Sequence, residues 1–324
     1  MKRSYLLICA ILISLASCKS SKSISSDQIK ELDKELFNKG VTIFEVIDET
    51  SMNYEIKNSD TTTSEGKIKH KTLTSTKENI LDYAYEQFKE VVNNYPNSNL
   101  YHKSLYNLSH ISALLGDEEK EITYLTMILE SNANDREHSG RSGLMSNPYS
   151  NFKNEASNRL TNIYIAKGDF KKAIQYKEIN KKHPLQHFCG NAFAADEMYS
   201  AGQYARIYNG LGETKKALSY VLPHVLDENG LASNLDIIHL SIEILKKNYE
   251  PAVLQRNFEK AMQHVYTKAI TQNGDEWIRY YIKYFDIEIE VPSWNFTFDT
   301  DSEKVKSKLK NTIIKSEFYK ELNE

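Results

Sequence analysis

Residues 168–176 read Gly-Asp-Phe-Lys-Lys-Ala-Ile-Gln-Tyr, and two other segments repeat this pattern in altered form. Residues 116–124 read Gly-Asp-Glu-Glu-Lys-Glu-Ile-Thr-Tyr, and residues 212–220 read Gly-Glu-Thr-Lys-Lys-Ala-Leu-Ser-Tyr. Each copy has an acidic residue after the Gly, an aliphatic residue six positions after it and a Tyr eight positions after it. Because Gly closes a helix in the left-handed conformation and an acidic residue opens the next helix, each copy predicts the turn of a helical hairpin.

The composition favours a folded, mostly helical protein. The 324 residues are 40% hydrophobic and 26% charged, and they include only 12 Gly and 6 Pro, which is typical of helices rather than of a strand-and-turn fold. The 41 basic and 44 acidic residues give a formal net charge of -3, so the charge offers no reason to propose nucleic acid as a partner.

Helical periodicity surrounds the three turns. Residues 75–78, Ser-Thr-Lys-Glu, form a capping box that predicts the start of a helix, and Pro96 is expected to close it. Its expected buried face consists of Leu81, Ala84, Phe88, Val91 and Val92. Further helices are expected over residues 100–115, 117–129, 154–167, 169–179, 192–211, 213–226, 234–247 and 251–265.

Three of these helical regions match a known repeat. Ala84, Phe88, Val91 and Pro96 stand at the spacing of the second helix of a tetratricopeptide (TPR) repeat. Further matches are Leu160, Tyr164, Gly168, Phe170 and Ala173, followed by Tyr208, Gly212 and Ala217. Residues 75–265 therefore resemble the TPR family, which implies a superhelix of helical hairpins. The three Gly are 52 and 44 residues apart instead of the family's 34, so residues 131–149 and 180–191 are expected to loop out.

The N-terminus has the pattern of an export signal. Lys2 and Arg3 precede a short apolar run that ends in Leu15-Ala16-Ser17-Cys18, which resembles the lipobox of bacterial lipoproteins. The resemblance implies a signal peptide over residues 1–17, acyl chains such as palmitate on Cys18, and a tether over residues 18–27. An ordinary signal peptide with a chance Cys is the alternative. Lys19 stands where an Asp would resemble an inner-membrane retention signal, so we expect a lipid anchor in the outer membrane, facing the periplasm.

Both ends of the repeat region have a different character. Residues 28–74 are expected to form a lead-in that is partly β, because residues 41–47 and 52–56 are rich in β-branched and aromatic side chains. Residues 266–324 are expected to cap the array with a β-hairpin over residues 277–285 and 287–291. A helix from Ser302 follows, bearing Val305, Leu309, Ile313, Phe318 and Leu322. A separate binding role for this segment is the alternative.

The resemblance to TPR proteins also implies a binding surface on the first helix of each pair. Its register points to Lys103, Tyr106, His110, Asn158, Asn162, Tyr199, Arg206 and Asn209. Cationic side chains among amides could bind a peptide carboxylate and backbone, and Tyr could flank side chains. A merely solvated helix face is the alternative for each residue.

Residues with metal-binding or nucleophilic chemistry gather at His183, His187 and Cys189. Pro184 pushes His183 out of the helical region, which breaks the helical spacing of the two His. Since no phosphate-binding loop or nucleophile motif occurs either, we expect no metal, no cofactor and no catalytic residue. Cys189 has no partner for an internal disulfide once Cys9 and Cys18 are removed or lipidated.

The leading hypothesis from the sequence is a non-enzymatic adaptor or scaffold, anchored by lipid in the cell envelope, that binds a protein or peptide. A second hypothesis is a lipoprotein that binds small molecules or glycans beside an outer-membrane importer. The third is an undetected enzyme in residues 180–324, which requires His183, His187, Cys189 and a carboxylate to converge in one pocket.

Overall fold

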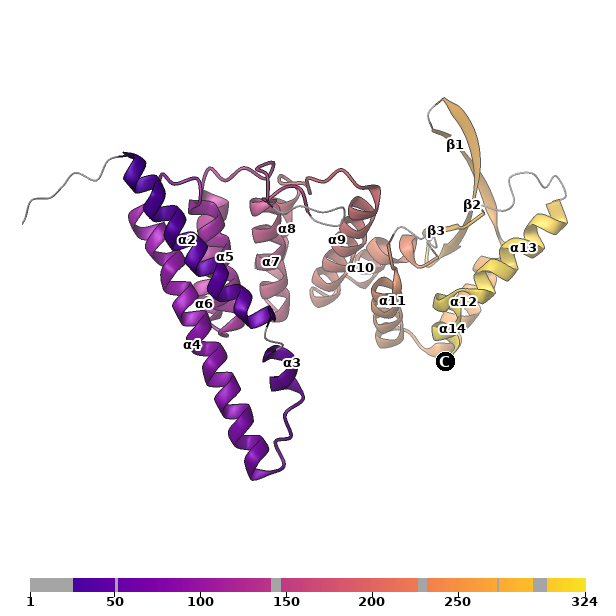
Figure 1. Ribbon diagram of the computed structural model, residues 1–324. Coiled ribbons are helices and arrows are strands. Elements are labelled where there is room, and N and C mark those ends of the chain that lie inside the picture. Colours follow the sequence, from indigo (N-terminus) through magenta and orange to yellow (C-terminus); the bar gives the residue numbers. More distant parts are fainter. Residues whose placement is uncertain (1–25, 50–51, 141–146, 227–231, 273, 294–301) are drawn as a thin grey trace, which may run out of the picture. The chain divides into compact units, whose positions relative to one another are not determined.

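The computed structural model describes residues 26–49, 52–140, 147–226, 232–272, 274–293 and 302–324 (Figure 1). These residues are mostly helical, with one small antiparallel sheet near the C-terminus, so the expected mostly α class is confirmed. They divide into two compact units, one up to Tyr124 and one from Leu125 onward. The expected signal peptide, Cys18 and the tether as far as residue 25 lie outside the described residues. No described helix combines the length and hydropathy needed to cross a bilayer.

The first unit packs three long helices around one core. Its elements are α2 (Ser26–Glu49), α3 (Met52–Lys57), α4 (Ser64–Asn94), α5 (Tyr101–Leu114) and the beginning of α6 (Glu118–Glu130). The core lies between α2, α4 and α5, where Leu81, Phe88 and Leu108 are buried. Gly40 permits the close approach of α2 to α4, because a β-carbon there would lie 2.7 Å from the ring of Phe88.

The prediction of a partly β lead-in is wrong, because α2 and α3 are helices throughout their described residues. Residues 41–47 have high β propensity, but Val41, Phe44 and Ile47 recur every three residues. This spacing places them on one helical face, where Ile47 is buried and the other two pack against the same core. Burial of an amphipathic helix therefore outweighs the weak preference of these residues for strands.

The predicted helix start at Ser75 is also wrong. Helix α4 begins at Ser64, and the hydroxyl of Thr63 accepts a hydrogen bond from the backbone N–H of Gly66 at 3.0 Å. No Gly or Pro occurs from residue 67 to residue 94, so nothing in this stretch interrupts the helix. The predicted end near Pro96 is confirmed, as are the buried positions Leu81, Ala84, Phe88 and Val91. Val92, also predicted to be buried, is half-buried and packs against the same core.

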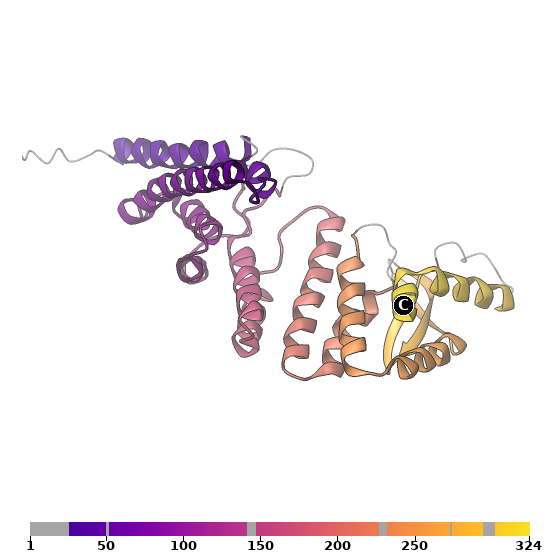
Figure 2. The same cartoon turned by 90° about the horizontal axis from the view of Figure 1, so that it is seen from below.

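The second unit consists of helical pairs followed by the sheet and two helices. Its elements are α7 (Phe152–Ala166), α8 (Phe170–Asn180), α9 (Gly190–Gly210), α10 (Thr214–Val221), η1 (Leu222–His224), α11 (Leu235–Asn248), α12 (Pro251–Gln263), β1 (Tyr266–Gln272), β2 (Asp275–Tyr284), β3 (Ile287–Val291), α13 (Ser302–Lys315) and α14 (Glu317–Asn323). Helices α9 and α11 lie side by side (Figure 1 and Figure 2). Their adjacency creates a pocket between them.

The three Gly turns predicted from the sequence are confirmed. Gly116, Gly168 and Gly212 have φ values of 74°, 70° and 79°, in the left-handed region. After α7, the Gly168 N–H donates to the carbonyl of Ile165, and the Asp169 N–H donates to that of Tyr164. The turns at Gly116 and Gly212 repeat the same two bonds. Each helix thus ends in a Schellman motif, in which a residue without a β-carbon is favoured.

Replacing Gly168 by Ala is therefore expected to lower the free energy of unfolding by about 1 kcal/mol, because an L-residue pays a steric penalty in this conformation. The effect is conformational, since a β-carbon at Gly168 would meet no atom within 4 Å. Urea unfolding followed by circular dichroism checks this. An unchanged unfolding midpoint would contradict the assigned turn geometry.

Each turn is also followed by a Lys at one fixed position, for which the sequence pattern predicted no role. Lys120, Lys172 and Lys216 each stand four residues after the Gly, and their ammonium groups lie over the rings of Tyr85, Tyr164 and Tyr208 at 5.5, 5.0 and 3.9 Å from the ring centroids. The Tyr eight positions after the Gly contacts the same ring in every copy. The repeated segment therefore encodes a cation–π contact between neighbouring helices as well as a turn.

The predicted C-terminal hairpin is confirmed as β2 and β3, joined at Phe285 and Asp286, which both have positive φ. Strand β1 precedes them and was not predicted; the antiparallel order is β1-β2-β3. The predicted single helix is two helices, divided at Ser316, whose hydroxyl caps α14. Its five predicted apolar residues are all buried, and they share one core with the inner face of the sheet.

Candidate functional site

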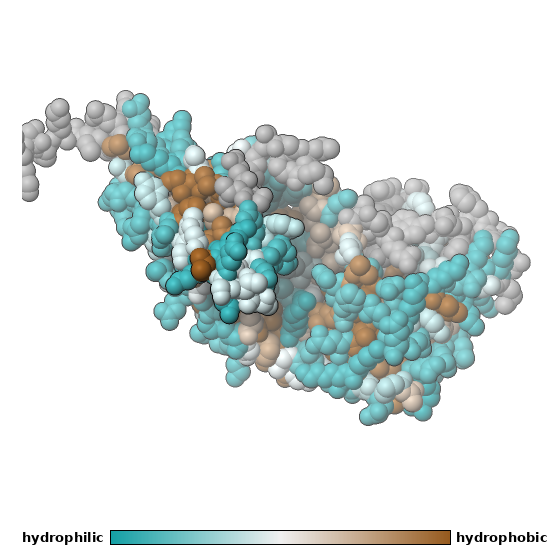
Figure 3. All heavy atoms as spheres, turned by 60° about the horizontal axis from the view of Figure 1, so that its bottom comes forward, coloured by the Kyte–Doolittle hydropathy of each residue, from teal (hydrophilic) through white to brown (hydrophobic). Residues whose placement is uncertain are grey.

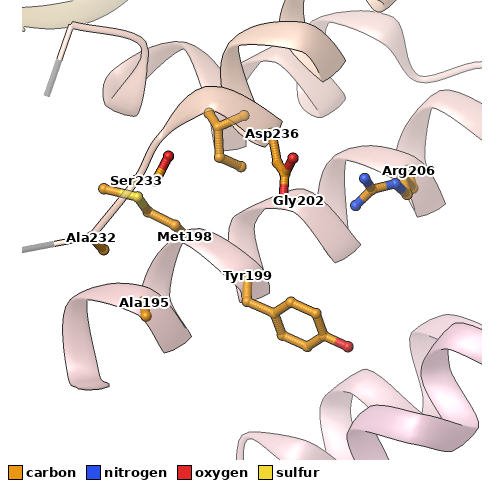
Figure 4. A pocket seen from close by; sticks show the side chains of 9 residues that line it. Ala195, Met198, Tyr199, Gly202, Arg206, Ala232, Ser233 and Asp236 are labelled. Carbon is orange, nitrogen blue, oxygen red and sulfur yellow. The ribbon is translucent and has the colours of Figure 1, made fainter. Parts of the chain in front are cut away.

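A pocket of about 360 Å³ lies between α9 and the beginning of α11 (Figure 4). Its volume falls near the lower end of the range of pockets that hold small ligands. Its lining includes Met198, Tyr199, Gly202 and Arg206 on α9, and Asp236 and Ile237 on α11. On the face drawn in Figure 3, hydrophilic residues cover most of the described surface and hydrophobic residues form separate patches.

Helical spacing brings the residues of α9 into the pocket. Tyr199, Gly202 and Arg206 stand three and four positions apart, so they share one face of the helix. Gly202 leaves space there, because a β-carbon would lie 3.1 Å from Nη1 of Arg206 and 3.5 Å from Cδ1 of Ile237. The Arg206 side chain thus folds back over Gly202.

The pocket carries both signs of charge. Asp236 lies in the first turn of α11, where a negative charge is favourable near the helix N-terminus. Within the described ranges, neither Asp236 nor Arg206 forms an ion pair. Met198 and Ile237, both buried, supply an apolar wall. A ligand with an acceptor, a donor and an apolar part would match these groups.

A polar network of side chains crosses α7, α8 and α9. At its centre is Lys177, whose side chain is only 1% exposed. Its Nζ donates to Gln203 Oε1 at 2.7 Å, to Asn180 Oδ1 at 3.0 Å and to Asn158 Oδ1 at 3.5 Å. The buried ammonium is therefore surrounded by neutral amide oxygens, and no carboxylate lies within ion-pair distance of it in the described structure.

Burial changes the protonation of this network. Desolvation lowers the pKa of Lys177 to about 8, and the more distant carboxylate of Asp196 opposes this only in part. Burial also raises the pKa of Asp196 above the ordinary value of a carboxyl group. The ring of Tyr204 lies 5.5 Å from the Lys177 ammonium, and burial raises the pKa of its hydroxyl to about 12.

The predicted binding residues of the second unit are only partly brought together. Tyr199 and Arg206 line the pocket, and exposed Asn162 donates a hydrogen bond to the Tyr199 hydroxyl. Asn158 is only 7% exposed and bonds to Asn154 and Lys177, so its assignment to an open groove is corrected: it belongs to the buried network. Asn209 is half-buried and is not among the pocket residues.

The remaining three predicted residues lie on α5, in the first unit. Lys103 and Tyr106 are half-buried, and His110 is exposed. The ring of Phe44, on α2, lies 5.7 Å from that of His110 in an edge-on contact. Each of the three has an interaction within the protein. They form no part of the α9–α11 pocket.

The residues of the possible enzyme site do not gather around one point. Nδ1 of His183 lies 3.9 Å from Oδ2 of Asp135, whereas Nδ1 of His187 accepts the backbone N–H of Cys189. Cys189 is a partly buried free thiol. In the described residues, no three His, Cys, Asp or Glu side chains are grouped in a way that could hold a metal ion.

No known family model, curated protein or solved structure matches this chain. Its function must therefore be inferred from the residues themselves.

The sequence did not predict three residues of the polar network and the pocket: Lys177, Gln203 and Asp236. Lys177 stands four positions after buried Ala173, so its place on the apolar stripe of α8 was a usable signal. Gln203 lies in a buried run of α9 in the same way. Asp236 offered no such signal, because only the packing of α11 against α9 brings it into the same pocket as Arg206.

Proposed function

We propose that this protein is a non-enzymatic scaffold or adaptor, anchored by lipid in the bacterial cell envelope, that binds a protein or peptide partner through TPR-like helical pairs. The α9–α11 pocket is the observation that carries the binding part. It lies between the first helices of two successive pairs and is lined by Tyr199, Arg206 and Asp236, and among the residues that the structure describes neither Arg206 nor Asp236 forms an ion pair. The lipobox at residues 15–18 supports the anchor and the location.

The pocket's chemistry suits a peptide. Tyr199 and Arg206 can donate hydrogen bonds to oxygens, Asp236 can accept from N–H groups, and Met198 with Ile237 can contact an apolar side chain. A glycan or other small molecule delivered to an outer-membrane importer is the second candidate. The moderate volume of the pocket and its apolar wall favour it, because both are common in small-ligand sites.

The binding hypothesis is tested by crosslinking in cells that carry the full-length chain. A photoreactive amino acid at Ala195, which lines the pocket, is expected to capture a discrete envelope protein. Replacing Arg206 by Ala in the same chain is expected to reduce capture about tenfold or more, because a charge-assisted hydrogen bond is lost. Arg256→Ala, an exposed Arg on α12, is the matched control and should change nothing. Equal capture by the Arg206→Ala variant would contradict the proposed site.

The lipid anchor is tested separately by labelling with a palmitate analogue. Cells that express the natural chain are expected to incorporate the label, and a Cys18→Ser variant is expected to incorporate none, since the acylated sulfur is lost. Cys189→Ser is the control, because this thiol lies in the folded second unit. Labelling of the Cys18→Ser chain would contradict the lipoprotein assignment.

A further inference from the structure

Three hydrogen bonds lead from the buried ammonium of Lys177 to the pocket, and all three donate in the same direction. Nζ of Lys177 donates to Oε1 of Gln203 at 2.7 Å, and Nε2 of Gln203 donates to Oδ1 of Asn162 at 2.9 Å. Nδ2 of Asn162 then donates to the hydroxyl oxygen of Tyr199. The chain of bonds therefore ends at a side chain that lines the pocket.

The ammonium fixes this direction. Because a protonated Lys has three donors and no acceptor, Gln203 must present its oxygen to it. The amide nitrogen of Gln203 consequently faces two oxygens, the carbonyl of Asn158 at 3.3 Å and Oδ1 of Asn162. Asn162 is left to turn its own nitrogen toward Tyr199. The Tyr199 oxygen thus accepts a hydrogen bond, and its hydrogen is left to donate outward.

Arg206, on the same face of α9, is likewise purely a donor. A ligand that satisfies Tyr199 and Arg206 together must present acceptor oxygens, and a carboxylate does so with charge-assisted bonds. Asp236, on the opposite wall, adds a second condition. Its negative charge disfavours a doubly charged group such as phosphate and favours a cation beside the carboxylate.

We propose that Tyr199 and Arg206 bind the carboxylate of an acidic side chain in a peptide, and that Lys177 is a positioning residue that orients the Tyr199 hydroxyl through Gln203 and Asn162. Asp236 then selects peptides in which a basic side chain accompanies the acidic one. This inference rests on the proposed function, since it names the chemical group that the pocket recognises.

The mechanism predicts a dependence on pH. Four groups face the Lys177 ammonium: Asp196 and Tyr204 from α9, Glu178 from α8, and Lys181, which directly follows α8. The α7 side chain that contacts it, Asn158, is a neutral amide. Burial lowers the pKa of Lys177 to about 8. Above that pH the neutral amine of Lys177 has a lone pair and can accept a hydrogen bond. The direction of the hydrogen bonds from Lys177 to Tyr199 is then no longer imposed, and the Tyr199 hydroxyl becomes a poorer donor to the ligand.

The test uses the full chain purified in detergent and three blocked dipeptides, whose affinities are measured by NMR titration. Acetyl-Lys-Glu-amide is expected to bind about tenfold more tightly than acetyl-Lys-Gln-amide, because only the first carries the carboxylate. On the natural chain, acetyl-Gln-Glu-amide is expected to bind more weakly than acetyl-Lys-Glu-amide. On the Asp236→Asn variant, the two peptides are expected to bind with equal affinity. Equal affinity for the Glu and Gln peptides, or no binding of any, would overturn the carboxylate site.

Tyr199→Phe removes only the hydroxyl and is expected to weaken binding of acetyl-Lys-Glu-amide about fivefold to tenfold. The exposed Tyr54→Phe is its control. The natural chain should lose affinity as the pH rises from 7 to 9, whereas Tyr199→Phe and Lys177→Met should show no such loss. A pH dependence that persists in Tyr199→Phe would overturn the role of Lys177. Failure of these tests with continued crosslinking of an envelope partner would leave the proposed function intact.

Discussion

Replacing Lys177 by Ala is expected to lower the free energy of unfolding by about 2–5 kcal/mol, combining a cavity with unsatisfied polar groups. The buried side chain fills the space between α7, α8 and α9, and three amide oxygens accept from its ammonium. Asn180 and Gln203 would each keep a buried oxygen without this donor. Those losses outweigh the relief of no longer burying a charge, because several acceptors depend on one donor.

The matched variant is Lys177→Met, which keeps most of the aliphatic length but no charge. It should destabilise less than Lys177→Ala, and the difference measures the packing of the stem. Urea unfolding of both variants at pH 7 gives the comparison. If Lys177→Ala were as stable as the natural chain, the buried network would not be holding the three helices together.

The same Lys imposes a pH dependence on stability. Its pKa is about 8 in the folded protein, below the ordinary 10.5 that the unfolded chain should show. Between these values the unfolded chain binds more protons than the folded one, so stability is expected to rise with pH from about 8 to 10. Below pH 8 both states are protonated, and this residue adds no slope. The rise should be absent in Lys177→Met, and a rise that remained there would have to come from another group.

Replacing Gly40 by Val is expected to cost about 1–3 kcal/mol through overpacking of the first unit. A β-carbon at this position would lie 2.7–3.0 Å from three ring atoms of Phe88. Phe88 is 1% exposed and sits between α2 and α4, so its ring has no free space to enter. The gain in helix propensity on replacing Gly by the β-branched Val, less than about 0.5 kcal/mol, is smaller than this penalty.

Two further variants isolate the cause. Gly190→Ala is the control, because a β-carbon there meets no atom within 4 Å and stability should stay within about 0.5 kcal/mol of the natural chain. Phe88→Leu replaces the opposing ring by a smaller side chain. The double variant Gly40→Val/Phe88→Leu should therefore lose less unfolding free energy than the sum of the losses in the two single variants. Additive costs, measured by urea unfolding, would show that the two residues are not in contact.

Many of the secondary-structure elements could be predicted from short segments of the sequence. The Gly at 116, 168 and 212 mark turns because only a residue without a β-carbon adopts φ near +70° cheaply, and that preference acts over a few residues. The β2–β3 hairpin and the apolar stripe of α13 and α14 were readable for the same reason, since alternation and helical spacing are properties of short segments.

Long-range packing decided the rest. Residues 41–47 are helical because α4 offers a surface that buries their apolar side, and no local propensity reports a surface supplied by another helix. The network of Lys177 and the pocket of Arg206 and Asp236 arise where α7, α8, α9 and α11 meet. Tyr199 and Arg206 could be named as candidates from their chain positions, but the partners that give them chemistry are 22 to 37 residues away in the chain. Contacts of that separation are specified by how whole helices pack, because burial energy depends on the assembled surface and not on any one segment.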